Sequence, residues 1–328
     1  MKELIRVENL KKWFPVRKGF LSSLLGGEQL YVRAVDGVSF KIMEGEIFGL
    51  AGESGCGKTT TARAILRLVE PTEGKVYYRG VELTSLDKKQ LRKVRRELQI
   101  IFQDPYESLN PRMLICDIVA EPLVVQGVGG SKSEREERVA KALESVGLTP
   151  PEEFMYRFPH ELSGGQRQRV AIARALILRP KFIAADEPVS MLDMSIRAGI
   201  LNLMLDLKEK FGLSYLYITH DLATAKYVCD RIAIMYLGKI VEEGPAISVI
   251  DEPLHPYVKA LIESVPTPNP RVKVGEIPIK GEVPTPIDIP PGCRFHPRCP
   301  YATDKCKVKE PPKVEVEKNR YVACHLLS

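Results

Sequence analysis

Apolar and polar positions along the chain predict strands and helices in alternation. The expected strands span residues 4–10, 31–42, 46–51, 182–185 and 214–218. The run 46–51 is apolar almost throughout, as a strand buried on both faces requires. A helix is expected at about 195–210, between the last two strands. Strands that alternate with helices indicate an α/β fold with a largely parallel sheet.

Two other helices are predicted from their spacing and their ends. Apolar residues recur at helical intervals over 62–69, and Pro71 ends that run. A second helix is expected over 133–146, where Ser133 and Glu136 have the spacing of a capping box and a glycine follows the last turn. Both helices support the α/β interpretation.

The chain changes character after about residue 250. Of its 25 prolines, 14 lie beyond that point, and four of its 7 cysteines fall in the last 36 residues. One short helix is expected at 254–265, but the prolines that follow exclude longer helices and central strands. We therefore expect a main domain at 1–250 and a small irregular domain at 251–328 that is stabilised by a metal.

Composition narrows the classes of function. With 44% hydrophobic and 27% charged residues, the chain is typical of globular proteins. Its net charge of +6 permits a phosphate-bearing ligand, but no dense basic block indicates a nucleic-acid partner. The sequence has no apolar stretch of about 18 residues and no secretory signal. We therefore expect a cytoplasmic protein without a membrane span, in which clustered thiols bind metal more readily than they form disulfides.

A glycine-rich segment supplies a candidate phosphate-binding loop. Residues 52–59 match G-x-x-x-x-G-K-[ST], with a strand before and a helix after. The loop's N–H groups and the helix N-terminus suit phosphate oxygens, Lys58 would reach the β- and γ-phosphates, and the Thr59 hydroxyl would bind Mg²⁺. The expected nucleotide contacts are Gly52, Ser54, Gly55, Cys56, Gly57, Lys58, Thr59 and Thr60.

Two further segments carry candidate ATP chemistry. The strand at 182–185 is followed by Asp186, which is placed to hold the shell of Mg²⁺, and by Glu187, which is placed to polarise the attacking water. The sequence LSGGQ at 162–166 precedes a helix-forming run and makes a second anion-binding segment. Since one chain has a single γ-phosphate site to fill, this second segment suggests contact with the nucleotide of another subunit.

Over residues 1 to about 250, the sequence resembles the ATP-binding cassette (ABC) ATPases. The matching motifs are the phosphate loop 52–59, the signature 162–166, the Walker B strand 182–187, the D-loop Ser190–Asp193, Gln103 and His220. The resemblance implies a P-loop ATPase core with a RecA-like subdomain, an antiparallel β subdomain and a helical signature subdomain at about 104–165. It also implies a head-to-tail dimer in which each ATP lies between one phosphate loop and the partner's signature.

The resemblance also implies roles for single residues. Lys58, Gln103, Glu187 and His220 would be catalytic; Gln103 would bind Mg²⁺ and sense the γ-phosphate, and His220 would hydrogen-bond that phosphate. The other expected nucleotide contacts are Ser163, Gly164, Gly165, Gln166, Asp186 and Asp193, with the signature serving the partner's ATP. Since Glu187 and His220 are both present, we expect an active ATPase. Without its context, His220 would be read as structural.

An aromatic side chain near the N-terminus is expected to stack on adenine in this family. The position at which the family carries this aromatic residue corresponds to Phe14 in this sequence, with Trp13 beside it. Tyr31 is an alternative because an insertion at 15–30 loosens the alignment. Core packing is the competing interpretation for all three rings.

Three segments narrow the resemblance to the ATPases of dipeptide and oligopeptide importers. They are residues 103–112, 255–261 and 292–300. Tyr106 and the N-terminal insertion resemble the second of the two paired ATPases of such importers. The resemblance implies a sister ATPase, two transmembrane permeases and an external solute-binding protein, with this chain peripheral on the cytoplasmic face of the membrane. The isolated chain could also form a homodimer.

Other functions remain as alternatives. Relatives of this group import oligosaccharides or nickel. A soluble ABC ATPase of translation or DNA repair would carry two cassettes in one chain or a long coiled coil, and this sequence has one phosphate loop, one signature and no heptad run.

The last four cysteines are candidate metal ligands. Cys293, Cys299, Cys306 and Cys324 could ligate one [4Fe–4S] cluster or one Zn²⁺, or form disulfides. The importer resemblance favours the [4Fe–4S] cluster, with zinc as the alternative. His296 and His325 are weaker candidate ligands, and Cys116 and Cys229 are expected to be buried apolar fillers.

Overall fold

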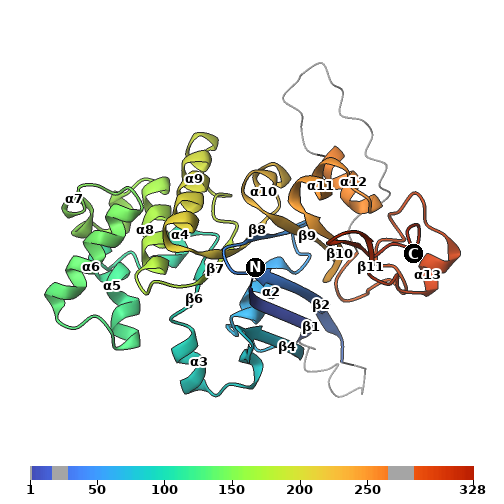
Figure 1. Ribbon diagram of the computed structural model, residues 1–328, viewed down its shortest axis with the longest axis horizontal. Coiled ribbons are helices and arrows are strands. Elements are labelled where there is room, and N and C mark those ends of the chain that lie inside the picture. Colours follow the sequence, from blue (N-terminus) through green and yellow to red (C-terminus); the bar gives the residue numbers. More distant parts are fainter. Residues whose placement is uncertain (1, 17–28, 265–283) are drawn as a thin grey trace, which may run out of the picture. The chain divides into compact units, whose positions relative to one another are not determined.

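The computed structural model describes residues 2–16, 29–264 and 284–328 (Figure 1). These residues form two compact units. The first unit combines the segment up to Leu4 with Ile42–Ile47 and Ser85–Ile218, and the second contains the rest. Most of the insertion expected at 15–30, and the prolines between 266 and 278, lie outside the described residues. None of the described helices is both long and apolar enough to cross a membrane.

Three parallel strands form the sheet of the first unit. They are β6 (Leu98–Ile101), β7 (Phe182–Asp186) and β8 (Ser214–Thr219), and β7 pairs with both others. Every residue of β7 and β8 is buried. The strands expected at 182–185 and 214–218 are confirmed, and burial along their whole length is typical of strands covered on both faces.

Helices make up most of the first unit. They are α3 (Lys88–Val94), α4 (Pro105–Ser108), α5 (Ile115–Gln126), α6 (Lys132–Ser145), α7 (Glu152–Met155), α8 (Gly164–Leu176) and α9 (Met194–Phe211). Helices α5, α6 and α8 pack against one another. Helix α9 agrees with the helix expected at 195–210.

The start of α6 corrects one prediction. The capping box is formed by Ser131 and Glu134, whereas Ser133 and Glu136 lie inside the helix. The Ser131 Oγ accepts the Glu134 N–H at 3.2 Å, and the Glu134 carboxylate accepts the Ser131 N–H at 2.8 Å. Both pairs have the S-x-x-E spacing, so the pattern could not choose between them. The extended backbone of Ser131 identifies it as the cap, because a capping residue lies outside the helix that it caps.

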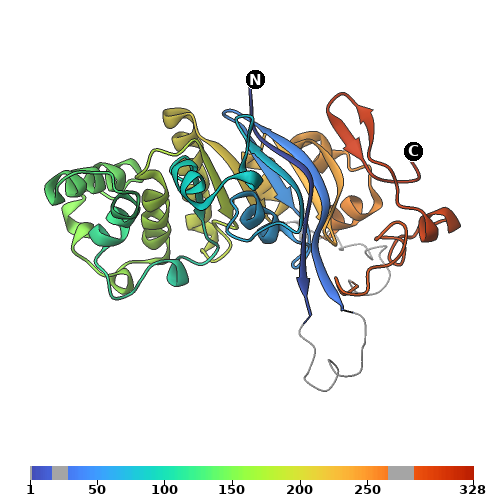
Figure 2. The same cartoon turned by 90° about the horizontal axis from the view of Figure 1, so that it is seen from below.

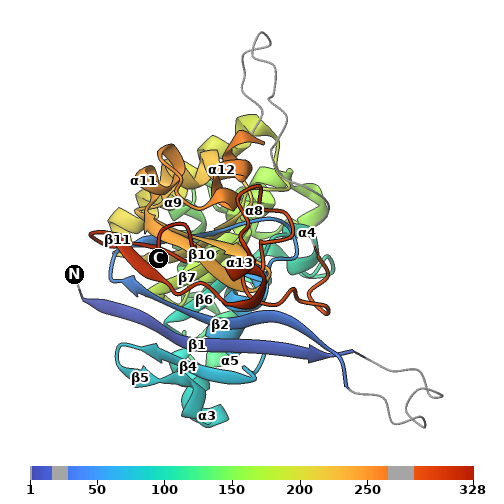
Figure 3. The same ribbon diagram turned by 90° about the vertical axis from the view of Figure 1, so that its right-hand side faces the viewer.

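The second unit contains a four-stranded antiparallel sheet. Its strands are β1 (Glu3–Pro15), β2 (Tyr31–Met43), β4 (Glu73–Tyr78) and β5 (Val81–Glu82), in the order β2-β1-β4-β5 (Figure 3). The long strands β1 and β2 run side by side, as Figure 2 shows from another direction.

A second group of strands in this unit carries the phosphate loop. Strand β3 (Ile47–Ala51) pairs in parallel with β9 (Arg231–Tyr236), which forms an antiparallel hairpin with β10 (Lys239–Pro245). Two strands near the C-terminus, β11 (Val314–Glu317) and β12 (Arg320–Val322), extend this sheet, with β12 paired to β10. The C-terminal segment is therefore held in part by sheet hydrogen bonds.

Short helices complete the second unit. They are α2 (Lys58–Ile65), α10 (Leu222–Val228), α11 (Ala246–Asp251), α12 (Pro256–Glu263) and α13 (Asp304–Val308). Helix α2 ends before Val69, where the apolar spacing had placed its end. Arg67 adopts a positive φ of 49°, and its guanidinium donates to the Leu83 carbonyl at 2.7 Å. That left-handed residue stops the helix earlier than Pro71 would.

A buried ion pair joins the C-terminal strands to the rest of this unit. The Arg320 and Glu242 side chains are 1% and 0% exposed, and their Nη2 and Oε1 atoms are 3.0 Å apart. The Glu242 carboxylate also accepts the N–H groups of Leu254 and His255 at 3.1 and 2.8 Å. Burial raises the pKa of Glu242, and the hydrogen bonds from His255 and Arg320 oppose that shift.

We expect Arg320→Met to lower the free energy of unfolding by about 3–5 kcal/mol, because it leaves the Glu242 carboxylate buried without a counter-charge. Urea unfolding of the full chain measures this loss. The double variant Arg320→Met/Glu242→Gln should recover much of the stability. Equal stability of Arg320→Met and the unmodified protein would contradict the expectation.

Candidate active-site residues

The phosphate loop connects a buried strand to a helix, as the motif predicts. Strand β3 is buried at every residue, and α2 begins at Lys58 after Gly57, which has a φ of 107°. The Lys58 Nζ donates to the carbonyls of Gly52 and Glu53 at 2.7 and 3.0 Å. The lysine ammonium therefore lies within the curve of its own loop, where the motif places phosphate oxygens.

Two glycines of the loop touch neighbouring backbone. A Cβ on Gly57 would lie 2.0 Å from the Ala34 carbonyl oxygen, and one on Gly52 would lie 2.2 Å from that of Met235. Both positions also have a positive φ. The loop can therefore follow this path only with glycine at these positions.

The remaining residues of the loop differ in exposure. Ser54 and Gly55 are exposed, whereas Thr59 and Thr60 are half-buried in the first turn of α2. Cys56 is buried, and burial raises the pKa of its thiol, so the group stays neutral. A buried, neutral thiol fits the expected packing role and leaves phosphate contacts to the backbone and Lys58.

In the first unit, Gln103 and Glu187 come together. The Gln103 Nε2 donates to the Glu187 Oε2 at 3.1 Å. Glu187 directly follows β7, has a positive φ of 45°, and donates its N–H to the Ile218 carbonyl at 3.0 Å. Its neighbour Asp186 is 2% exposed at the strand end. This left-handed backbone is uncommon in a non-glycine residue, and it turns the chain directly after the strand.

The signature segment forms the start of α8. Ser163 caps this helix: its Oγ accepts the Gln166 N–H at 3.3 Å, and the Gln166 Oε1 accepts the Ser163 N–H at 2.9 Å. A Cβ on Gly165 would lie 2.7 Å from Ile196 of α9, so this glycine permits close packing of the two helices. Ser163 is exposed, and a helix N-terminus of this kind favours an anion.

The other predicted residues of the ATP motifs lie at element ends. Gly164 is in the first turn of α8, and Asp193 is the exposed N-cap of α9. His220, an exposed residue of the second unit, directly follows β8. These positions suit contact with a ligand or partner more than packing in a core.

The adenine candidates lie on β1 and β2. The ring centroids of Trp13 and Tyr31 are 6.3 Å apart, and the Trp13 indole N–H donates to Asp36 at 3.0 Å. Phe14 and Tyr31 are 37% and 41% exposed, so neither packs in the core. The core-packing interpretation therefore does not hold for these two rings.

The four C-terminal cysteines lie near one another. No disulfide joins them. Burial raises the pKa of the Cys293 thiol to about 11, and the nearby thiols of Cys306, Cys324 and Cys299 add to that rise. The Cys293 N–H donates to the Cys306 carbonyl at 2.8 Å. Within the described residues, however, no three side chains of His, Cys, Asp or Glu are arranged as a set of metal ligands.

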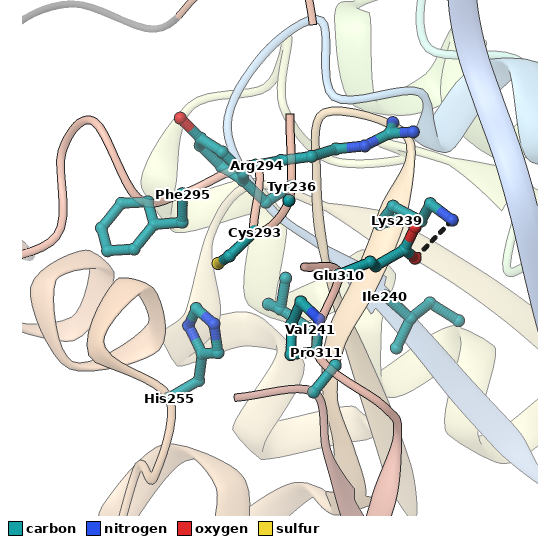
Figure 4. Close-up of a pocket in the computed structure, with 12 residues that line it drawn as sticks. Tyr236, Lys239, Ile240, Val241, His255, Cys293, Arg294, Phe295, Glu310 and Pro311 are labelled. Atoms are coloured by element: carbon teal, nitrogen blue, oxygen red, sulfur yellow. Dashed lines mark ion pairs between the residues drawn. The ribbon is translucent and has the colours of Figure 1, made fainter. Parts of the chain in front are cut away.

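The surroundings of Cys293 include a small cavity. Tyr236, His255 and Phe295 line it with Cys293 (Figure 4). The rings of the two weaker candidates, His296 and His325, hydrogen-bond to main-chain carbonyls at 2.9 and 2.8 Å. The remaining cysteines, Cys116 and Cys229, are buried, as predicted.

The contacts of two residues with the phosphate loop were not predicted from the sequence. Arg298 forms an ion pair with Glu53, and Tyr257 bonds to the Glu53 main chain. The two members of the ion pair are 245 residues apart, and no local sequence pattern indicates such a contact.

Comparison with family models gives two matches. Residues 35–190 match "ABC transporter", and residues 241–306 match "Oligopeptide/dipeptide transporter, C-terminal region".

Curated relatives resemble nearly the whole chain. The oligopeptide transport ATP-binding protein AppF of Bacillus subtilis (strain 168) is 47% identical over 99% of this chain and 98% of its own length. The putative oligopeptide transport ATP-binding protein YkfD of the same organism is 50% identical over 92% of this chain and 91% of its own.

A solved structure has the same fold. It is the dimeric post-hydrolysis state of the ATP-binding cassette MJ0796 bound to ADP and Pi, with a TM-score of 0.64 and 33% identity. The alignment covers 74% of this chain and 99% of that one. The likeness confirms the predicted α/β P-loop ATPase fold, to which this chain adds a C-terminal region.

We expect Gly57→Ala to weaken ATP binding strongly and to lower stability by about 1–3 kcal/mol, because its Cβ would collide with the Ala34 carbonyl at a positive φ. Gly80→Ala is the matched control: Gly80 lies outside the ATP motifs and also has a positive φ, but no atom lies within 4 Å of its Cβ position. Calorimetric titration with MgATP and thermal melting measure both variants. Equal losses in the two would contradict the role of the backbone collision.

Proposed function

Because the chain belongs to the ATP-binding subunits of the oligopeptide and dipeptide ABC transporter family, we propose that it hydrolyses ATP to drive the uptake of di- or oligopeptides. The observation that carries the mechanism is the hydrogen bond between Gln103 and Glu187, two motif residues that are 84 positions apart in the sequence. It places an amide donor on the carboxylate that is expected to act as the base.

In the proposed mechanism, the phosphate loop binds the nucleotide. Its N–H groups and the Lys58 ammonium, now held by two carbonyls of the loop, would turn to the β- and γ-phosphates. As the family resemblance implies, Thr59, Asp186 and Gln103 would bind Mg²⁺; their hydroxyl, carboxylate and amide oxygens are ligand types that suit this ion. When bound, Mg²⁺ would neutralise charge on the phosphates.

Hydrolysis then needs an activated water. Glu187 would accept a proton as the water oxygen attacks the γ-phosphorus, while the bond from that phosphorus to the ADP oxygen breaks. The Gln103 amide orients the Glu187 carboxylate through their 3.1 Å hydrogen bond. His220 would donate a hydrogen bond to the γ-phosphate.

A second cassette would complete each nucleotide site. The capped N-terminus of α8, with Ser163 exposed and the glycines next to it, suits the γ-phosphate of an ATP bound to a sister ATPase. Asp193 at the exposed start of α9 would lie in the same interface. Two transmembrane permeases and an external solute-binding protein would form the rest of the importer, with this chain peripheral on the cytoplasmic face of the membrane.

We also propose that Cys293, Cys299, Cys306 and Cys324 hold a [4Fe–4S] cluster. The supporting observations are that all four cysteines fall in the last 36 residues and that the Cys293 N–H donates to the Cys306 carbonyl at 2.8 Å. Burial makes an isolated thiolate unfavourable, and iron would supply the compensating positive charge. The thiols must rotate or shift to bind it, since they do not form a ligand set as they stand.

We expect Glu187→Gln to reduce ATP turnover by about 10²–10⁴-fold while ATP binding is retained, because the amide cannot accept the proton. Turnover should be measured on the complete transporter in proteoliposomes. Glu209→Gln, on the exposed side of α9, is the matched control. Undiminished turnover in Glu187→Gln would refute the assignment of the base.

The same proteoliposomes decide the transported solute. The expected result is turnover stimulated by a solute-binding protein loaded with peptide. Stimulation by oligosaccharide or nickel alone would assign the chain to an importer of that solute instead of peptides. Stimulation by ribosomes or DNA would overturn the importer assignment.

Protein prepared anaerobically should be brown and contain roughly four iron and four sulfide per chain. Cys293→Ser should lose the colour, whereas Cys116→Ser, which removes a buried cysteine outside the four, should keep it. Iron and sulfide assays with visible absorption measure this. Colourless protein with one equivalent of zinc would show that the cluster assignment is wrong.

A further inference from the structure

We propose that Arg298 is a positioning residue of the phosphate loop, which it serves by cancelling the charge of Glu53. The inference rests on the proposed binding of ATP at this loop. Arg298 lies in the C-terminal segment, in the turn between Cys293 and Cys299. It would make this segment, far from the loop in sequence, a determinant of ATP affinity.

The contact between the two side chains is a two-pronged ion pair. The Arg298 Nη1 lies 3.0 Å from the Glu53 Oε2, and the Nη2 lies 3.2 Å from the Oε1. The Arg298 side chain is 9% exposed and that of Glu53 is 25% exposed. Paired, largely desolvated arginine–carboxylate contacts are stronger than surface ion pairs and fix orientation as well as charge.

Aromatic rings hold the arginine in place. The Arg298 guanidinium carbon lies 5.8 Å from the ring centroid of Tyr236 and 6.0 Å from that of Phe295. Tyr257, fully buried against both rings, accepts the Glu53 N–H on its hydroxyl at 3.0 Å. Glu53 is thus bound through its main chain and its side chain to one packed cluster.

Electrostatics explains why the pair matters for ATP. Glu53 follows the first glycine of the loop, and its carbonyl accepts the Lys58 ammonium at 3.0 Å. A bare carboxylate next to a binding site for a polyanionic nucleotide would repel it. Arg298 cancels that charge while keeping Glu53 as an anchor for the loop.

A second arginine of the same turn reinforces the link. Arg294 forms an ion pair with Asp36, the residue that accepts the Trp13 indole N–H. Asp36 also donates its N–H to the Gly238 carbonyl at 3.0 Å. The turn from Cys293 to Cys299 therefore contacts both the phosphate loop, through Glu53, and Asp36, the hydrogen-bond partner of the candidate adenine-stacking residue Trp13.

The test is MgATP binding to the full-length chain by calorimetric titration. Arg298→Gln should weaken binding about tenfold, since it leaves the Glu53 charge uncompensated. The double variant Glu53→Gln/Arg298→Gln should return to within about threefold of the unmodified protein, a rescue that a purely structural arginine would not show. Lys307→Gln, on an exposed ion pair of the same segment, is the matched control and should change nothing.

Several outcomes would overturn the proposal. Unchanged affinity in Arg298→Gln, or a double variant as weak as the single one, would exclude the charge role. If Arg298→Gln does not fold, Glu53→Gln decides by itself: it should bind MgATP at least as tightly as the unmodified chain, and weaker binding refutes the proposal. Lys58→Ala distinguishes failure of the charge role from failure of ATP binding at this loop, on which the inference rests. Unchanged affinity in that variant would refute ATP binding at the loop itself.

Discussion

The close approach of the phosphate loop to neighbouring backbone is the constraint on which the second unit depends. Gly52 and Gly57 lie so close to the carbonyls of Met235 and Ala34 that no side chain fits. The loop therefore packs directly against β9 and β2, and these contacts fix where α2, the helix after the loop, begins. Lys58, the first residue of that helix, donates its ammonium to the Gly52 carbonyl of the loop at 2.7 Å.

A second constraint operates at the end of β7 in the first unit. The strand is buried along its length, and the chain turns sharply after it through the left-handed Glu187. That turn brings the carboxylate to Gln103, which lies just after β6, the strand paired with β7. The parallel pairing of the two strands thus places two distant motif residues at one edge of the sheet.

Three arginines attach the C-terminal segment to the rest of the second unit. Arg320 reaches Glu242, Arg294 reaches Asp36, and Arg298 reaches Glu53. Such a segment has few apolar residues with which to build a core of its own, so charge pairs and two added strands hold it to the sheet. The cost of desolvating each arginine is met by a carboxylate that is already placed by the sheet or the loop.

The sequence by itself determined the α/β fold, the ATP motifs and the family, because these depend on local spacing: buried strands read as continuous apolar runs, and the phosphate loop needs its glycines and lysine in a fixed order. It could not distinguish Ser131 from Ser133 as a helix cap, or place the end of α2, because both depend on the backbone path. Only the tertiary structure decided that Arg298 meets Glu53, since contacts across 245 residues arise from the packing of whole elements and leave no periodic trace in the chain.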